Sequence, residues 1–107
     1  MKLYSIYDAK AETWLPPFTA LNDEIAKRDL FSAISGNANI PLAQYPTDFA
    51  LVRLGEWQAG TACPVQLAQI PENLGTVWMI INEFHARKAV QPTAAVEGSV
   101  ENGKAVQ

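Results

Sequence analysis

The chain is poor in the side chains that most often carry reactions, with one cysteine and one histidine among 107 residues. A single cysteine excludes an intrachain disulfide and a metal site built from several cysteines. Cys63 precedes Pro64 in an expected hairpin loop, and we expect it to be partly buried and unreactive because no cationic or basic neighbour is visible. His85 lies near the end of an expected helix, where we expect it to favour the helix C-terminus rather than catalysis.

Other signatures of chemistry are also missing. There is no glycine-rich phosphate loop, and no pair of acidic residues has a spacing typical of catalytic carboxylates. We therefore predict no catalytic residue, no metal site and no cofactor, and we do not expect an enzyme. No apolar run approaches the length of a membrane span, and the first eight residues lack the apolar block of a signal peptide.

An excess of basic residues is absent too. Eight lysine and arginine residues face eleven aspartate and glutamate residues, which gives a formal net charge of −3. Affinity for phosphate backbones comes largely from basic side chains that displace counterions. Nucleic-acid binding by this chain would therefore need a local basic patch, a symmetric oligomer that gathers basic groups, or aromatic stacking.

Two hairpins are predicted from the apolar pattern. Residues 2–7 alternate as a strand rich in tyrosine, and residues 13–15 form a short returning strand that ends at Pro16 and Pro17. Residues 49–54 form the most apolar strand, which continues to Trp57. After a turn, residues 65–70 pair back as a fourth strand.

Helical periodicity appears twice. Residues 22–35 form the first predicted helix, with Asn22 or Asp23 as its cap and Gly36 as a left-handed C-terminal residue. Residues 74–88 form the second, with a strand as the alternative because of the β-branched residues. Residues 36–48 read as a loop long enough to carry a function.

The predicted fold class is therefore α+β, with an antiparallel sheet of about four strands in two hairpins and two helices. Residues 1–89 form one domain and residues 90–107 a flexible tail without periodicity.

The aromatic residues on the predicted sheet are the remaining candidates for binding. An open sheet face can stack unpaired bases while basic residues follow the backbone. Packing in the core is the competing explanation for any one aromatic residue, although Tyr4 or Tyr7 should face outward because strand neighbours point to opposite faces. Trp78 and Phe84 either cover the sheet or form a dimer interface. The candidate DNA-binding residues are Lys2, Tyr4, Tyr7, Lys10, Arg53 and Trp57.

Three segments carry a family resemblance. The segment Met1–Phe18 (MKLYSIYDAKAETWLPPF) resembles the start of the small non-structural proteins of gokushoviruses, single-stranded DNA phages of the Microviridae. Residues 23–31 (DEIAKRDLF) look like the helix of that family, and residues 45–57 (YPTDFALVRLGEW) resemble its Pro-x-Asp-aromatic and Leu-Gly-x-aromatic segment. Together the matching segments lie within roughly residues 1–60.

The resemblance implies a non-enzymatic phage accessory protein of the host bacterial cytoplasm. It would bind single-stranded DNA or the replication complex in the switch from double-strand synthesis to genome packaging. It assigns no particular residue to that role. The alternative is a protein-interaction module that contacts the replication initiator, the procapsid or a host factor through residues 36–48. A homo-oligomer is compatible with either function.

Overall fold

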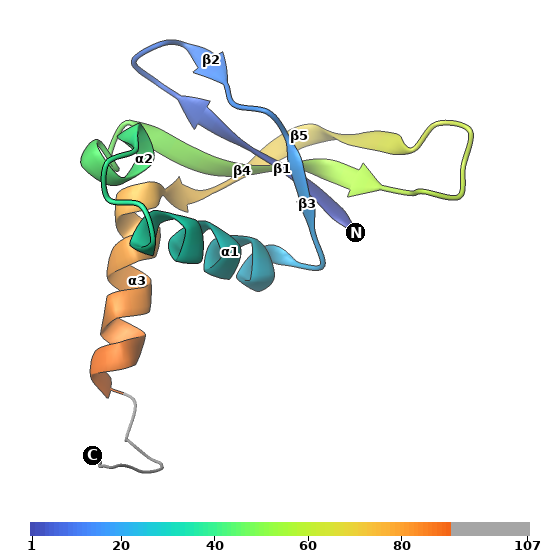
Figure 1. Cartoon of the computed structure of the whole chain (residues 1–107). Helices are drawn as coiled ribbons and strands as arrows, with labels where there is room; N and C mark the ends of the chain where they lie inside the picture. The colour runs from blue at the N-terminus through green and yellow to red at the C-terminus, as the bar shows by residue number, and fades with distance from the viewer. Residues whose placement is uncertain (91–107) are drawn as a thin grey trace.

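The N-terminal strand β1 (Lys2–Asp8) is the centre of the sheet, because it pairs with three other strands. The computed structural model describes residues 1–90, which form a five-stranded antiparallel sheet and three helices (Figure 1). The α+β class is confirmed, with one strand and one short helix more than predicted. After β1 come β2 (Thr13–Trp14), β3 (Phe18–Ala20), α1 (Asp23–Ser35), α2 (Pro41–Gln44), β4 (Phe49–Trp57), β5 (Val65–Thr76) and α3 (Val77–Val90).

Strands β2 and β3 both pair with β1, at opposite ends of it. The register aligns Tyr7 with Trp14 and Tyr4 with Phe18, and Pro16 and Pro17 lie between the two short strands. The short returning strand ends before the two prolines as predicted, but the prediction that all pairing ends there was wrong, because β3 pairs with β1 after them. Proline removes an N–H donor but keeps the chain extended, so pairing resumes after the two residues.

The second hairpin is longer than predicted on its returning side. Strand β5 runs to Thr76, so residues 74–76 are strand and the helix begins at Val77 instead of residue 74. Gly75 has a φ of 118°, a conformation that glycine adopts without the steric cost of a side chain, at the point where the strand gives way to the helix. The sequence interpretation had allowed for either structure in this segment, and the segment contains both.

Helix α1 begins with the expected cap. The Asn22 side chain accepts a hydrogen bond of 2.9 Å from the backbone N–H of Ile25. The helix ends at Ser35, but Gly36 has a φ of −86° and is not left-handed as predicted. The predicted loop at residues 36–48 contains the short helix α2, whose Leu42 and Ala43 pack against the core.

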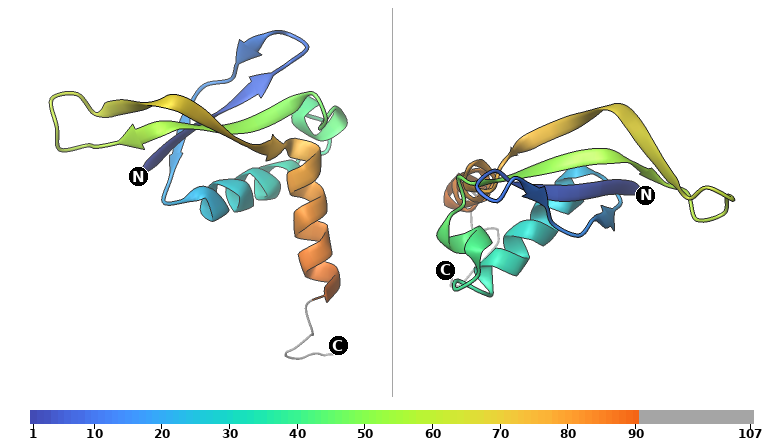
Figure 2. Two further views of the ribbon diagram at one scale, coloured as in Figure 1. Left: turned by 180° about the vertical axis from the view of Figure 1, so that it is seen from behind. Right: turned by 90° about the horizontal axis from the view of Figure 1, so that it is seen from above.

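The core lies between one face of the sheet and the helices. Helices α1 and α3 both lie on this side, and Figure 2 shows no helix over the opposite face within residues 1–90. The two faces follow from the alternation of strand side chains: Tyr4 and Ile6 belong to the helix-covered face, and Ser5 and Tyr7 to the helix-free face. The core residues are Tyr4, Ile6, Ala20, Ala26, Leu30, Ile34, Phe49, Leu51, Val77 and Ile80.

The predicted tail, residues 90–107, lies outside the described residues except for its first position. Within residues 1–90, no helix has the length and the apolar character that a membrane crossing requires.

Candidate functional site

The structure divides the six predicted DNA-binding residues between the two faces of the sheet. Lys2, Tyr4 and Arg53 lie on the helix-covered face, where β1 and β4 approach the start of α1. Tyr7 and Trp57 lie on the helix-free face, and Lys10 lies in the turn between β1 and β2. The predicted residues therefore do not form one site.

Tyr4 is part of the core and is not available to a base. Its side chain is 0% exposed, and its ring stacks on Phe18 with 5.7 Å between centroids. Its hydroxyl donates a hydrogen bond of 2.7 Å to Asp23, and burial raises the pKa of that hydroxyl. The assignment of Tyr4 to DNA stacking was wrong, because the residue lies under α1 rather than on the helix-free face.

Arg53 is held by carboxylates. Its guanidinium donates to Asp23 of α1 and, over 3.1 Å, to Glu72 of β5. Partial burial raises the pKa of Asp23, but the hydrogen bonds from Tyr4 and Arg53 outweigh it, so the pKa of this carboxyl lies below its usual value. The positive charge of Arg53 is therefore neutralised by the carboxylates of Asp23 and Glu72.

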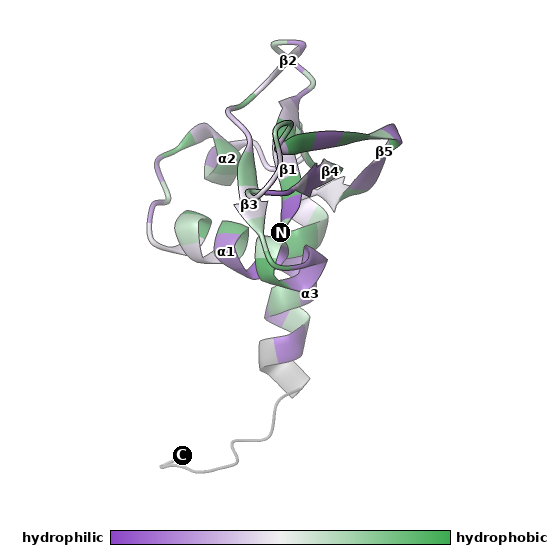
Figure 3. Cartoon of the chain, turned by 90° about the vertical axis from the view of Figure 1, so that its right-hand side faces the viewer, coloured by the Kyte–Doolittle hydropathy of each residue, from purple (hydrophilic) through white to green (hydrophobic). Residues whose placement is uncertain are grey.

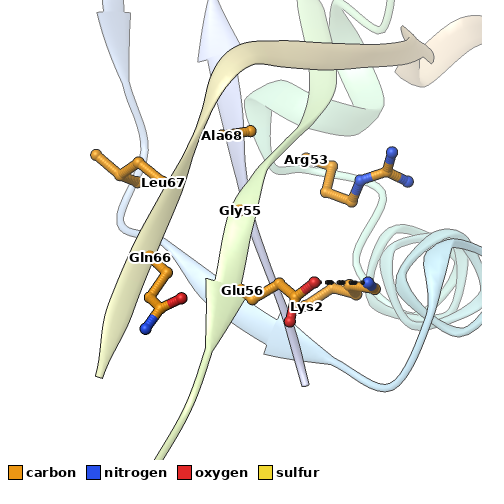
Figure 4. Close-up of a pocket in the computed structure, with 7 residues that line it drawn as sticks. All are labelled: Lys2, Arg53, Gly55, Glu56, Gln66, Leu67 and Ala68. Atoms are coloured by element: carbon orange, nitrogen blue, oxygen red, sulfur yellow. Dashed lines mark hydrogen bonds and ion pairs between the residues drawn. The ribbon is translucent and has the colours of Figure 1, made fainter. Parts of the chain in front are cut away.

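Lys2 is paired in the same way. Its ammonium group lies 3.2 Å from the carboxylate of Glu56, and Figure 4 shows the pair beside Arg53 at the rim of an open hollow of about 450 Å³. The two cations of this region lie among three carboxylates, those of Asp23, Glu56 and Glu72. This arrangement offers no net positive charge to a phosphate.

Gly55 is required where β4 meets β5. A Cβ at this position would lie 2.1 Å from the carbonyl oxygen of Gln66 and 2.8 Å from the Cα of Leu67. Only a residue without a side chain allows the two backbones to approach this closely. The Leu67 side chain points to the opposite side of the sheet from Arg53 (Figure 4), toward the helix-free face.

The helix-free face carries an aromatic pair at one end. Tyr7 and Trp14 are register partners, with 5.0 Å between ring centroids and 59° between ring planes. Trp14 is 48% exposed. Trp14 was not among the predicted site residues, although its position in the short returning strand opposite Tyr7 was a signal that could have identified it.

An apolar groove occupies the other end of the same face. Trp57, which is 36% exposed, lies beside it near the end of β4. The groove has a volume of about 610 Å³ and is lined by Leu3, Thr19, Leu54, Trp57, Val65 and Leu67, among others. Three aromatic side chains, Tyr7, Trp14 and Trp57, therefore belong to a surface that no described helix covers.

Lys10 differs from the other predicted cations. Its side chain is exposed and makes no ion pair with any residue of the described part of the chain. The turn that carries Lys10 is fixed by Asp8, whose carboxylate accepts hydrogen bonds of 3.0 and 3.2 Å from the backbone N–H groups of Lys10 and Ala11. Lys10 is thus free to contact a ligand bound near Tyr7 and Trp14.

Two residues singled out in the sequence have simple structural positions. Cys63 is exposed in the β4–β5 turn, so the prediction of partial burial was wrong; the turn extends beyond the rest of the sheet. The rings of His85 and Phe31 form a T-shaped pair with 5.6 Å between centroids, and α3 continues five residues beyond His85. His85 is therefore not in the last turn, where a capping role was expected.

Helix α3, the second helix expected from the sequence, packs only some of its aromatic side chains against the core. Phe84 packs against the core and stacks on Phe31, whereas Trp78 is largely exposed. Among residues 1–90, no group of three or more histidine, cysteine, aspartate or glutamate residues is arranged to hold a metal ion.

Comparison with known proteins gives one match. The family model described as Phage ORF5 protein matches residues 1–78. No curated protein and no solved structure matches the chain. Because the family match covers more than two thirds of the sequence, including all five strands and α1, the chain belongs to the Phage ORF5 protein family.

Proposed function

We propose that this phage protein is a non-enzymatic accessory factor that binds single-stranded DNA through the helix-free face of its sheet. The observation that carries the proposal is the placement of Tyr7, Trp14 and Trp57 on that face, with two of the three rings substantially exposed. The gokushovirus resemblance of the N-terminal segment supports a role in the switch to genome packaging, directly on DNA or within the replication complex.

Stacking is the contribution that this surface offers best. Each base stacked on an aromatic side chain contributes about 1–3 kcal/mol, and every base has a face that can stack. Basic groups contribute less here, because Lys2 and Arg53 are paired with carboxylates and only Lys10 is unpaired among the predicted cations. Binding is therefore expected to depend little on sequence and only modestly on salt.

The proposal is tested by fluorescence anisotropy with a labelled single-stranded oligonucleotide at low and moderate salt. Trp14→Ala and Trp57→Ala should each weaken binding by about fivefold or more, from the energy of one stacked base. Trp78→Ala is the matched control, because Trp78 is more exposed than either Trp14 or Trp57 but lies on α3. Absence of binding at micromolar protein, or an equal loss in all three variants, would contradict direct DNA contact through this face.

A protein-interaction module is the second candidate function. The pairing of cations with carboxylates favours this function. So does the exposed side chain of Tyr45, which lies in residues 36–48, the segment predicted from the sequence as long enough to carry a function. Trp78 donates its backbone N–H to the carbonyl of Pro46, which places α3 beside this segment. The replication initiator, the procapsid proteins and host factors are the proposed partners.

This alternative is tested by affinity capture from phage-infected cells after nuclease treatment. A replication or procapsid protein that is captured by the wild type and by Trp57→Ala, but not by Tyr45→Ala, would support it. Recovery of DNA without any such protein would count against it and favour the first proposal.

A further inference from the structure

Strand β5 contains a stretch that stays extended without a partner on β4. The register pairs Val65–Leu67 with the end of β4 and Glu72–Thr76 with its start, and residues 68–71 face a single β4 residue, Leu54. Figure 2 shows β5 arching away from β4 between these two paired parts. The backbone groups of residues 68–71 therefore lie at the outer edge of the sheet, where β5 has no other neighbour within residues 1–90.

The same edge lacks the charges that usually protect an edge strand. Exposed edges are commonly blunted by lysine or other charged residues, by proline, or by a bulge. From Gln58 to Pro71 the chain contains no charged residue, and Pro71 and the bulge are the features of this edge that limit pairing. Leu67 is 68% exposed and Ile70 is 84% exposed, and Figure 3 shows apolar residues interspersed with polar ones along β5.

The net charge of the chain indicates which kind of partner can bind this edge of β5. Each copy carries a formal net charge of −3, so two copies approach with least repulsion where neither presents a charge. A nucleic acid would gain nothing from this edge, because neither a cation nor an aromatic side chain lies between Gln58 and Pro71. An uncharged, extended and apolar edge is instead complementary to an identical edge.

We propose that a second copy of the chain pairs with this edge, with the β5 strands of the two copies antiparallel across a twofold axis near Ala68 and Gln69. Such an interface is self-complementary, because each residue contacts its equivalent set on the partner. Leu67 then packs against the partner on the helix-free face and Ile70 on the opposite face, and the unpaired backbone groups of residues 68–70 gain partners. The interface is short, so the dimer forms in a concentration-dependent way.

Sedimentation velocity of the full chain, over about 1 to about 300 µM protein, tests the proposal. Leu67→Lys and Ile70→Lys each bring a lysine from both copies close to the axis and should each weaken the dimer by about tenfold or more. Ala59→Lys is the matched control: it adds the same charge at an exposed position of the same hairpin but outside the paired segment, so the dimer should change less than about twofold.

A second measurement follows the backbone itself. Amide hydrogen exchange at residues 68–70 should slow as protein concentration rises in the wild type, and not in Ile70→Lys. Because Leu67 and Ile70 are exposed, the lysine variants should keep the circular dichroism spectrum and the thermal midpoint of the wild type. Three results would each overturn the proposal. The protein could stay monomeric at every concentration, Ala59→Lys could weaken the dimer as much as Ile70→Lys, or amide exchange at residues 68–70 could be independent of protein concentration.

Discussion

The hydroxyl group of Tyr4 donates a hydrogen bond of 2.7 Å to the carboxylate of Asp23, and this contact joins the first strand to the first turn of α1. Arg53 of β4 donates to the same carboxylate. Asp23 therefore connects two neighbouring strands to the helix that covers them. The carboxylate also suits its position at the helix N-terminus, where negative charge is favourable.

Replacing Asp23 by asparagine should reduce stability in a pH-dependent way. The pKa of Asp23 is lowered in the folded protein, so its ionised form contributes stability above its unfolded pKa of about 4, and that stability is lost as pH falls below it. Urea unfolding at about pH 7 should show Asp23→Asn less stable than wild type by about 1–2 kcal/mol, with a smaller difference near pH 3.

Asp29→Asn is the control for this experiment, because Asp29 is exposed on the same helix and has no ion pair among the described residues. It should follow the wild type at both pH values. If the two variants respond to pH alike, the proposed role of the Asp23 cluster is wrong.

A methyl group at position 55 should destabilise the β4–β5 hairpin. In Gly55→Ala the new Cβ meets the backbone of Gln66 and Leu67, which moves only if the strand shifts. Overpacking of this kind costs about 1–3 kcal/mol, measurable as a lower urea midpoint. Gly60→Ala is the matched control, because a Cβ at that turn position meets nothing within 4 Å. Equal midpoints for the two variants would show that β5 adjusts freely.

The sheet was largely predictable because its strands carry strong local signals. The alternation in residues 2–7 and the apolar run in residues 49–54 determined β1 and β4, and the cap at Asn22 determined the start of α1. Strand β3 was missed because its pairing is a tertiary event: three residues after two prolines have no pattern of their own, and β1 provides their partner.

The candidate site was less predictable for a related reason. Alternation separates Tyr4 from Tyr7, but it does not say which face the helices cover, and α1 covers the face of Tyr4. The cations were misleading in the same way, because sequence shows that Lys2 and Arg53 are basic but not that Glu56 and Asp23 neutralise them. Pairing across distant elements is set by the fold.

Lys10 should account for most of the salt dependence of DNA binding if the helix-free face is the binding surface. Each phosphate contact contributes about 0.7 to the slope of the logarithm of affinity against the logarithm of salt concentration for single strands. Lys10→Ala should lower the slope by about that amount. Arg28→Ala removes an exposed charge from α1 on the other side of the sheet and should leave the slope unchanged. A larger effect of Arg28→Ala would place the DNA on the helical side.

Pairing of two copies along β5 should lengthen the DNA segment that each complex protects. The twofold axis of an antiparallel pair runs perpendicular to the sheet, so the helix-free faces of both copies lie on the same side. A DNA strand bound by one copy can then continue to the other copy, which raises the affinity for DNA through effective concentration.

With oligonucleotides of increasing length, affinity should rise a second time at about twice the length that saturates a monomer. Ile70→Lys should abolish the second rise and keep the first, whereas Ala59→Lys should keep both. A second rise that persists in Ile70→Lys would separate DNA binding from the paired edge, and loss of both rises would place Ile70 in the DNA-binding surface itself.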